Sequence, residues 1–290
     1  MNKKISVIGG DLRQIKAASC LKEHGFDVLL TGFDEDKIYD KTLSLENDIH
    51  KSIEFADILV FPLPMAYDET HMNTPLYEGD YYVVDTLKLI TKNELLLAGM
   101  ISPKFQTLLN VYGIYAIDYY QRDEIQILNA VPTAEGAIEI AMRELPVTLH
   151  DSRALVIGYG RIGKILAKML GGIGAHVTAS ARKCADIASI SAYSHEPVYT
   201  KDIKSRISEF DVIFNTVPSC VLDRQTLEQA RPDTVIIDLA SKPGGVDFEA
   251  AKELGLNVIW ALSLPGKVAP ITAGKIITDT ILNIIGELGV

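Results

Sequence analysis

The sequence predicts an α/β fold of two domains, each a parallel sheet with crossover helices. Three observations predict it. The chain has 290 residues, about twice the usual length of one domain. Short apolar runs alternate with helical patterns, and this alternation restarts after residue 150. Each half opens on an apolar strand that runs into glycines, "ISVIGG" at residues 5–10 and "ALVIGYG" at residues 154–160.

The composition argues against several classes of function. Apolar residues make up 48% of the chain and charged residues 23%, as in ordinary globular proteins. The formal net charge is −10 and the basic residues are scattered, so neither a nucleic acid nor a membrane is an expected partner. Cys20, Cys184 and Cys220 are far apart, which predicts neither disulfides nor a metal site. No apolar run is long enough to span a bilayer, so we expect a cytoplasmic location.

The first half predicts an N-terminal substrate and catalytic domain at residues 1–130. The expected elements are strands at 4–8, 28–31, 56–64, 94–100 and 114–120, with helices at 13–24 and 103–113. This order is typical of a flavodoxin-like or Rossmann-like sheet. Residues 65–80 form the longest irregular stretch, which is either a functional loop or a plain connection.

A linker helix is expected at residues 132–146. The helix starts at Pro132 or Thr133, Glu135 then falls in the first turn, and Pro146 ends the helix. We therefore place the domain hinge at residues 130–150. A last helix at residues 270–290 is long enough to return to the N-terminal domain and pack on it.

The second half, residues 131–270, predicts a dinucleotide-binding domain. Six strand patterns, the number expected for a Rossmann sheet, lie at residues 153–158, 175–180, 197–200, 211–217, 234–240 and 256–262. The first pattern runs into a GxGxxG turn, whose glycines allow the tight turn, the approach of a pyrophosphate and the packing of helix on strand. The expected cofactor contacts of this Rossmann NAD(P)-binding fold are Gly158, Tyr159, Gly160, Arg161, Ile162 and Gly163.

The end of the second strand distinguishes NAD from NADP. An Asp or Glu there would bind the ribose 2′-hydroxyl of NAD. This chain has Ser180, Arg182 and Lys183 instead, and an arginine can bind the 2′-phosphate of NADP through charge-assisted hydrogen bonds. We therefore expect NADP, with NAD as the alternative.

Three further strand ends fall at the carboxyl edge of this sheet, where ligands bind in doubly wound folds. They are "NTVPS" at 215–219, "DLASKPGG" at 238–245 and "LSLPGKVAP" at 262–270. We expect cofactor contacts there from Thr216, Val217, Pro218, Ala240 and Lys267. For Pro218 the alternative is turn formation alone.

Six motifs together resemble one known family. "VIGGDLRQ", "NAVPTAEGAI", "GYGRIGK", "NTVPS", "DLASKPGGVDF" and "LPGKVAPITAG" are similar, in matching order, to the A subunits of dipicolinate synthase. The resemblance implies oxidation of dihydrodipicolinate, or of 4-hydroxy-tetrahydrodipicolinate, to dipicolinate with a nicotinamide nucleotide as hydride acceptor. The partner that it implies is a flavoprotein-like B subunit, and the location is the mother cell of a sporulating bacterium.

A dicarboxylate substrate needs cationic partners, because burying two unpaired carboxylates is prohibitive. Arg13, Lys242 and Lys267 are the cations that the motifs bring toward an expected interdomain cleft, each with a surface ion pair as the alternative. Aromatisation also releases a proton, and Asp11 and Glu135 at expected helix starts are the candidate acceptors, unless they only cap their helices. The expected catalytic set is Asp11, Arg13, Glu135 and Lys242.

The two glycine turns are expected to serve different ligands. Gln14 stands where GxGxxG spacing from Gly9 requires a third glycine. We therefore interpret Gly9 and Gly10 as an anion-friendly turn for a substrate carboxylate. Among the six histidines, only His71 in the long loop is placed to reach a cleft.

Two other functions stay open on the sequence. One is another NADP-dependent dehydrogenase of a 2-hydroxy or 2-imino acid, which would share the fold but not the paired "DLASKPGG" and "LPGKVAP" motifs. The other is a nucleotide-binding, non-catalytic subunit whose partner performs the redox step. Assembly into a homo-oligomer also stays open.

Overall fold

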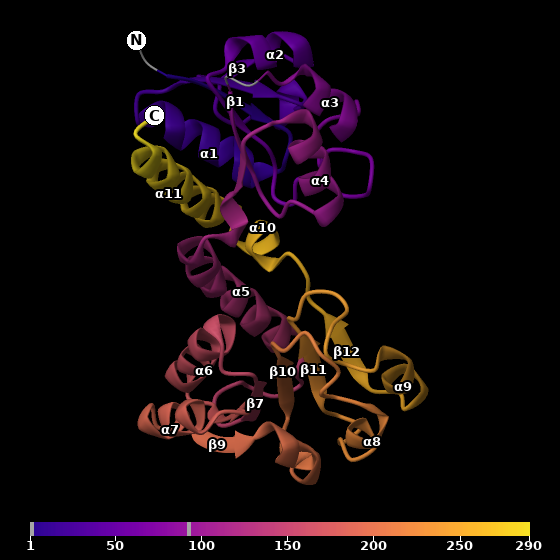
Figure 1. Ribbon diagram of the computed structural model, residues 1–290. Coiled ribbons are helices and arrows are strands. Elements are labelled where there is room, and N and C mark those ends of the chain that lie inside the picture. The colour runs from indigo at the N-terminus through magenta and orange to yellow at the C-terminus, as the bar shows by residue number, and fades with distance from the viewer. Residues whose placement is uncertain (1–2, 92–93) are drawn as a thin grey trace. The chain divides into compact units, whose positions relative to one another are not determined.

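The computed structural model describes residues 3–91 and 94–290. The chain divides into two units (Figure 1): unit 1 is Met1–Leu128 together with Ala269–Val290, and unit 2 is Asn129–Val268. Unit 1 is therefore discontinuous in sequence, because unit 2 is inserted between its two segments. Within the described ranges, no helix is both long enough and apolar enough to cross a membrane.

Unit 1 contains a parallel sheet in the order β3-β2-β1-β4-β5-β6. Its strands are β1 (Lys4–Ile8), β2 (Asp27–Thr31), β3 (Ser44–Leu45), β4 (Ile58–Val60), β5 (Leu95–Ala98) and β6 (Ala116–Asp118). The strand order reverses between β1 and β4, which defines a doubly wound sheet. The predicted fold class is confirmed for this unit, and the order is the Rossmann order rather than the flavodoxin one.

Helices cover both faces of the unit 1 sheet. They are α1 (Leu12–Glu23), α2 (Ile49–Phe55), α3 (Val83–Leu89), α4 (Pro103–Tyr112) and α11 (Pro270–Leu288), with 3-10 turns at Glu35–Lys37 and Tyr119–Gln121. Ile5 and Val7 of β1 face a core shared with α1 and α11, whereas Ile8 faces a core shared with α2, α3 and α4. This two-sided burial explains why the strands are almost continuously apolar.

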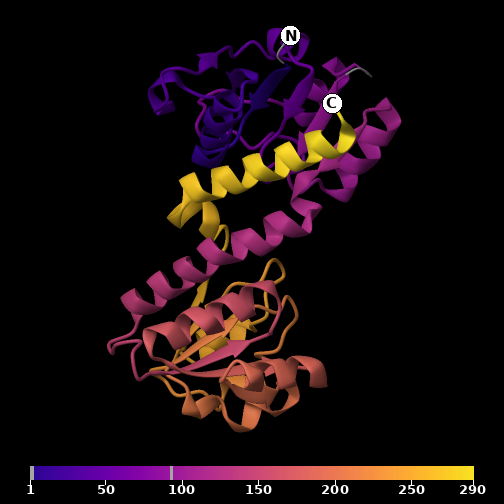
Figure 2. The same cartoon turned by 90° about the vertical axis from the view of Figure 1, so that its left-hand side faces the viewer.

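The α11 helix packs closely along α1 (Figure 2). A Cβ atom at Gly274 would lie 2.6 Å from the carbonyl oxygen of Arg13, so only glycine permits this approach of the two helices. Ile277 and Ile281 of α11 are buried in the same core as Leu21 of α1. The last helix therefore completes the core of unit 1.

Unit 2 contains a second parallel sheet, in the order β12-β11-β10-β7-β8-β9. Its strands are β7 (Arg153–Ile157), β8 (His176–Ala181), β9 (Glu196–Tyr199), β10 (Val212–Asn215), β11 (Val235–Asp238) and β12 (Asn257–Trp260). The order reverses between β7 and β10, as in the predicted Rossmann fold, which is confirmed. The carboxyl ends of β7 and β10 therefore flank the position at which such folds bind ligands.

The helix α5 (Asp123–Glu144) is longer than the sequence predicts. The helix expected from residue 132 begins at Asp123, so Pro132 lies in its interior and Glu135 lies in its middle rather than in its first turn. The proline removes only one helical hydrogen bond, and the Thr133 hydroxyl donates to the Asn129 carbonyl at 2.7 Å. Burial of Ile125 and Ala130 outweighs the preference of proline for a helix start.

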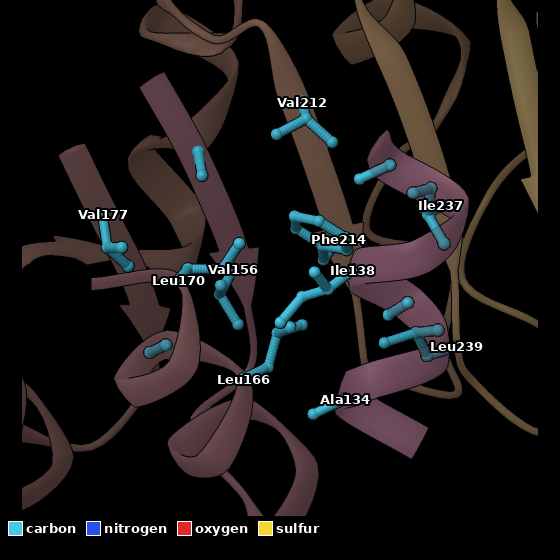
Figure 3. Packing of buried hydrophobic residues seen from close by; sticks show 14 of the residues in the cluster. Ala134, Ile138, Val156, Leu166, Leu170, Val177, Val212, Phe214, Ile237 and Leu239 are labelled. Atoms are coloured by element: carbon cyan, nitrogen blue, oxygen red, sulfur yellow. The ribbon is translucent and has the colours of Figure 1, made fainter. Parts of the chain in front are cut away.

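The remaining helices of unit 2 cover both faces of its sheet. They are α6 (Arg161–Ile173), α7 (Cys184–Ala192), α8 (Arg224–Leu227), α9 (Phe248–Glu253) and α10 (Leu264–Val268), with 3-10 turns at Thr200–Ser205 and Ile207–Glu209. On one face, Val156 and Phe214 pack with Ile138 of α5 and Leu166 of α6 (Figure 3). The alternate strand residues face α8 and α9 on the other side.

Candidate functional site

The glycine turn of unit 2 joins β7 to α6. A Cβ atom at Gly158 would lie 2.5 Å from Thr216 Oγ1, and one at Gly163 would lie 2.0 Å from the Gly158 carbonyl oxygen. These two glycines are therefore required by the packing of the turn itself. A Cβ atom at Gly160 would meet nothing within 4 Å, and Gly160 provides no side-chain cap for α6. The second glycine thus leaves open space at a helix start, which is the arrangement that a pyrophosphate needs.

A pocket of about 340 Å³ lies at this turn. Its lining brings together eight of the residues that the sequence predicts for the cofactor: Gly158, Tyr159, Gly160, Arg182, Lys183, Thr216, Val217 and Pro218. The other predicted contacts are not part of its lining: Arg161, Ile162, Gly163, Ser180, Ala240 and Lys267. Five lining residues were not predicted from the sequence: Ala181, Asp186, Thr200, Ser219 and Val221.

Two cations and one carboxylate line the pocket beyond β8. Arg182 and Lys183 are exposed and have no ion-pair partner among residues 3–91 and 94–290. The carboxylate is Asp186, in the first turn of α7, which was not predicted as a pocket residue. Ser180 is fully buried, and its hydroxyl accepts a hydrogen bond from the Gly158 N–H at 3.3 Å. Ser180 therefore supports the turn from beneath, while Arg182 and Lys183 leave a net positive charge in the pocket.

A buried carboxylate organises the loops after β10 and β11. Asp238 is fully buried and accepts hydrogen bonds from Asn215 Nδ2 at 2.7 Å, the Ala240 N–H at 3.0 Å and the Gly245 N–H at 2.8 Å. The side chain of Asn215 in turn donates to the carbonyl oxygen of Val217 and accepts from its N–H, and Val217 lines the pocket. The motif "DLASKPGG" is thus a structural support of the pocket. An aspartate that ends the apolar run "VIID" was the signal for it in the sequence.

Two exposed lysines lie beyond β11 and β12. Lys242 and Lys267 have no ion-pair partner in the described part of the chain. The indole N–H of Trp260 donates to the Ala240 carbonyl at 2.9 Å, which ties the loop of Lys242 to the end of β12. A Cβ atom at Gly136 of α5 would lie 3.2 Å from Leu264 of α10, so the two helices are in contact there. Glu135, the residue before Gly136, is exposed.

The first glycine turn, at the end of β1, differs from the second. The N–H of Gly9 donates to the Thr31 carbonyl and the N–H of Gly10 to the Asn73 carbonyl, both at 2.7 Å. The expectation of an anion-friendly turn is therefore wrong, because these amides already have acceptors within unit 1. The acceptors come from β2 and from the loop at 65–80, and no local pattern announces them.

Asp11 and Arg13 form a closed pair at the start of α1. Asp11 is the N-cap, and its carboxylate accepts from the Arg13 N–H at 2.9 Å while Gln14 completes the capping box. The same carboxylate binds the Arg13 guanidinium through Nε at 2.9 Å and Nη2 at 2.9 Å, and Nη2 also donates to the Leu63 carbonyl. Both side chains thus hold α1 against the segment that follows β4.

Replacement of Arg13 by alanine is expected to lower the free energy of unfolding of unit 1 by about 2 kcal/mol. The change leaves the Asp11 carboxylate without its guanidinium partner and the Leu63 carbonyl without a donor. Urea unfolding followed by far-UV circular dichroism measures the loss. The matched control is Lys22→Ala on the same helix, for which we expect less than about 0.5 kcal/mol. Equal shifts in the two variants would contradict the structural role of Arg13.

The loop at residues 65–80 carries an oriented histidine. Asp68 accepts hydrogen bonds from the backbone N–H of His71, the backbone N–H of Thr70 and the ring Nδ1 of His71. These bonds, led by the one from the His71 backbone, hold the pKa of Asp68 well below its usual range. The His71 ring stacks on Tyr67 at 5.4 Å and contacts Tyr82 at 4.8 Å between centroids. The loop is thus ordered by its own contacts.

Metal ligands are not grouped in the described residues. Across 3–91 and 94–290, no set of three or more His, Cys, Asp or Glu side chains is placed to hold a metal ion. Cys20, Cys184 and Cys220 are all free cysteines.

Known proteins match both units. A family model described as the N-terminal domain of the dipicolinate synthase A subunit matches residues 4–120, and one described as the D-isomer specific 2-hydroxyacid dehydrogenase NAD binding domain matches residues 131–250. The A subunit of dipicolinate synthase from Bacillus subtilis (strain 168) is 31% identical over 288 residues, which cover 98% of this chain and 96% of that protein. Unit 2 is thus similar to NAD-binding domains of dehydrogenases.

Two solved structures extend the likeness to the fold of the whole chain. The A subunit of dipicolinate synthase from Bacillus halodurans has a TM-score of 0.91 at 27% identity, covering 98% of this chain and 97% of that one. Its counterpart in the dipicolinate synthase of Bacillus subtilis has a TM-score of 0.90 at 30% identity, covering 100% and 97%.

Proposed function

Because the chain belongs to the family of dipicolinate synthase A subunits, we propose that it oxidises dihydrodipicolinate, or 4-hydroxy-tetrahydrodipicolinate, to dipicolinate. The observation that carries the proposal is the pocket at Gly160, where a bare helix start and two unpaired cations suit a dinucleotide. The net step removes one hydride and one proton from the ring, and 4-hydroxy-tetrahydrodipicolinate additionally loses water. When bound, the nicotinamide supplies the hydride acceptor.

The proposed cofactor is NADP, with NAD as the alternative. The turn from Gly158 to Gly163 would hold the pyrophosphate, and Arg182 and Lys183 would bind the 2′-phosphate. Asp186 opposes them with one negative charge, so the selectivity is expected to depend on the balance of these three side chains. The opposite side of the pocket is lined by Thr216, Val217 and Pro218.

For the substrate carboxylates, we propose the exposed ammonium groups of Lys242 and Lys267. Both can bind a carboxylate without first breaking an ion pair with a described residue. Glu135 is the proposed proton acceptor, because its carboxylate is exposed and its helix contacts α10, which carries Lys267. A catalytic role for Arg13 and Asp11 stays a prediction, since within unit 1 the two side chains are already paired with each other. The proton loss creates an aromatic ring, so positioning is expected to matter more than base strength.

A flavoprotein-like B subunit is the proposed partner, and the mother cell of a sporulating bacterium is the proposed location. Both follow from the family rather than from a surface of this chain. A non-catalytic role, in which the partner performs the redox step, is the rival that the experiment must separate.

The decisive experiment uses the purified chain alone, NADP and freshly prepared 4-hydroxy-tetrahydrodipicolinate. We expect dipicolinate and NADPH to form in equal amounts, measured by their ultraviolet absorbance. The control is Gly160→Asp, whose side chain fits the fold but occupies the pyrophosphate position with a negative charge, so it should form neither product. Product formation only after addition of a flavin-binding partner would instead favour the non-catalytic role.

A further inference from the structure

Unit 2 has a second pocket, of about 790 Å³, beside the cofactor pocket. It lies along α6 and the turn from α7 to β9. The helices α6 and α7 cover the same face of the sheet (Figure 1). Lys164, Lys168 and Gly171 lie on one face of α6, and Tyr193 and His195 follow α7. The volume is within the range of small-molecule sites. Apart from Tyr159, none of its lining residues has a role in the proposed oxidation.

The pocket carries two uncompensated positive charges. Lys164 and Lys168 have no ion-pair partner within 3–91 and 94–290. The lining includes one carboxylate, Glu196, but it is bound to Arg206 Nη1 at 2.8 Å and accepts from the Thr178 hydroxyl at 3.0 Å. These two lysines make the second pocket locally cationic in a chain of formal net charge −10, so the pocket attracts an anion.

The walls of the pocket are suited to a flat ring. The ammonium group of Lys164 lies 5.6 Å from the centre of the Tyr159 ring, and Tyr193 is an exposed aromatic residue. A Cβ atom at Gly171 would lie 3.2 Å from the His195 ring, so glycine lets this ring lie against α6. Burial lowers the pKa of His195, which leaves a neutral imidazole able to form hydrogen bonds near pH 7.

The spacing of the cations favours a dicarboxylate over a phosphate. Residues four apart on a helix have Cβ atoms about 5–6 Å apart, which is comparable with the separation of two carboxylates on one six-membered ring. A phosphate is typically bound at a helix start or by an arginine fork. Here the start of α6 faces the other pocket, and the lysines lie along the flank of the helix.

We propose that this second pocket is an effector site for a small aromatic dicarboxylate. The ligand class rests on the proposed function, whose product is such a molecule. Tyr159 lines both pockets and stands between Gly158 and Gly160, so a ligand that contacts its ring acts directly beside the cofactor turn. Occupancy of the pocket therefore changes the affinity for the nucleotide, and the nucleotide changes the affinity for the dicarboxylate by the same factor.

The test is calorimetric titration of the full chain with pyridine-2,6-dicarboxylate. Wild type is compared with Lys164→Glu/Lys168→Glu and with the control Lys204→Glu/Lys252→Glu, which changes the charge equally at exposed positions of unit 2 outside both pockets. We expect binding at this site to weaken at least tenfold in the first variant and to be retained in the second. Thermal melting confirms that both variants are folded.

Two outcomes overturn the proposal. One is unchanged binding of the dicarboxylate in Lys164→Glu/Lys168→Glu. The other is tighter lysine-dependent binding of inorganic phosphate or AMP, which would assign the pocket to a phosphate ligand. Oxidation kinetics separate this proposal from the proposed function: the lysine variant should keep the wild-type kcat and KM but lose the change in the KM for NADP that added dicarboxylate causes in the wild type. An inactive wild type refutes the proposed function, whereas the titration still decides whether the pocket binds.

Discussion

Replacement of Asp238 by alanine is expected to lower the free energy of unfolding of unit 2 by about 3–5 kcal/mol. The backbone N–H groups of Ala240 and Gly245 lose their acceptor in a buried region, and Asn215 Nδ2 loses one of its two. Urea unfolding followed by Trp260 fluorescence measures the effect. Trp260 is the single tryptophan of the chain, and its indole N–H donates to the Ala240 carbonyl in the same loop.

The matched control is Asp247→Ala. Asp247 is the N-cap of α9, where its carboxylate accepts from the Ala250 N–H at 3.0 Å. It is only partly buried, so we expect its loss to lower the free energy of unfolding by about 1 kcal/mol. If both substitutions shift the midpoint equally, Asp238 is an ordinary cap and does not support the pocket. Asp238→Ala should also weaken nucleotide binding, because Asn215 positions Val217.

Replacement of Arg182 by aspartate is expected to weaken NADP binding about 100-fold and to leave NAD binding within about threefold of wild type. A charge-assisted hydrogen bond contributes about 1.5–3 kcal/mol, and the substitution also places a carboxylate near the 2′-phosphate. The exposed Arg182 has no ion-pair partner among the described residues, so its loss should not destabilise the fold. Calorimetric titration with each nucleotide measures the two dissociation constants.

Lys252→Glu provides the control for Arg182. It changes the charge by the same amount at an exposed position of α9, outside the pocket that Arg182 lines. A long-range effect of net charge would weaken NADP binding in both variants, whereas a direct contact affects Arg182→Asp alone. An equal loss of NADP and NAD binding in Arg182→Asp would remove the argument for NADP.

The strands could be predicted because the signals that define them are local. The apolar runs that become β7 and β10 are bounded by turn residues and buried on both faces, and the spacing of Gly158, Gly160 and Gly163 is itself steric. The class of both sheets could be predicted in the same way, as could most of the lining of the pocket at the Gly158–Gly163 turn. It failed at the start of α5, where burial of Ile125 outweighs a local proline preference.

Polar partners could not be predicted where they come from distant segments. The amides of Gly9 and Gly10 look free in the sequence, but their acceptors are Thr31 and Asn73. Asp186 lies only a few residues beyond the end of β8, yet the sequence does not tell whether its side chain faces the pocket. Hydrogen bonds between distant segments therefore decide whether the amides of a glycine turn are free to bind a ligand. No local pattern in a single sequence predicts these hydrogen bonds.

The discontinuity of unit 1 has a consequence for synthesis on the ribosome. Unit 2 is complete in the nascent chain before α11 has been made, whereas the apolar face of α1 that meets Ile277 and Ile281 stays uncovered until that helix emerges. Domains generally fold as the chain emerges, and an unfilled apolar face is open to aggregation or to chaperones. The core around α1 therefore reaches its final packing only after unit 2 and α11 have been made, although α1 precedes both in the sequence.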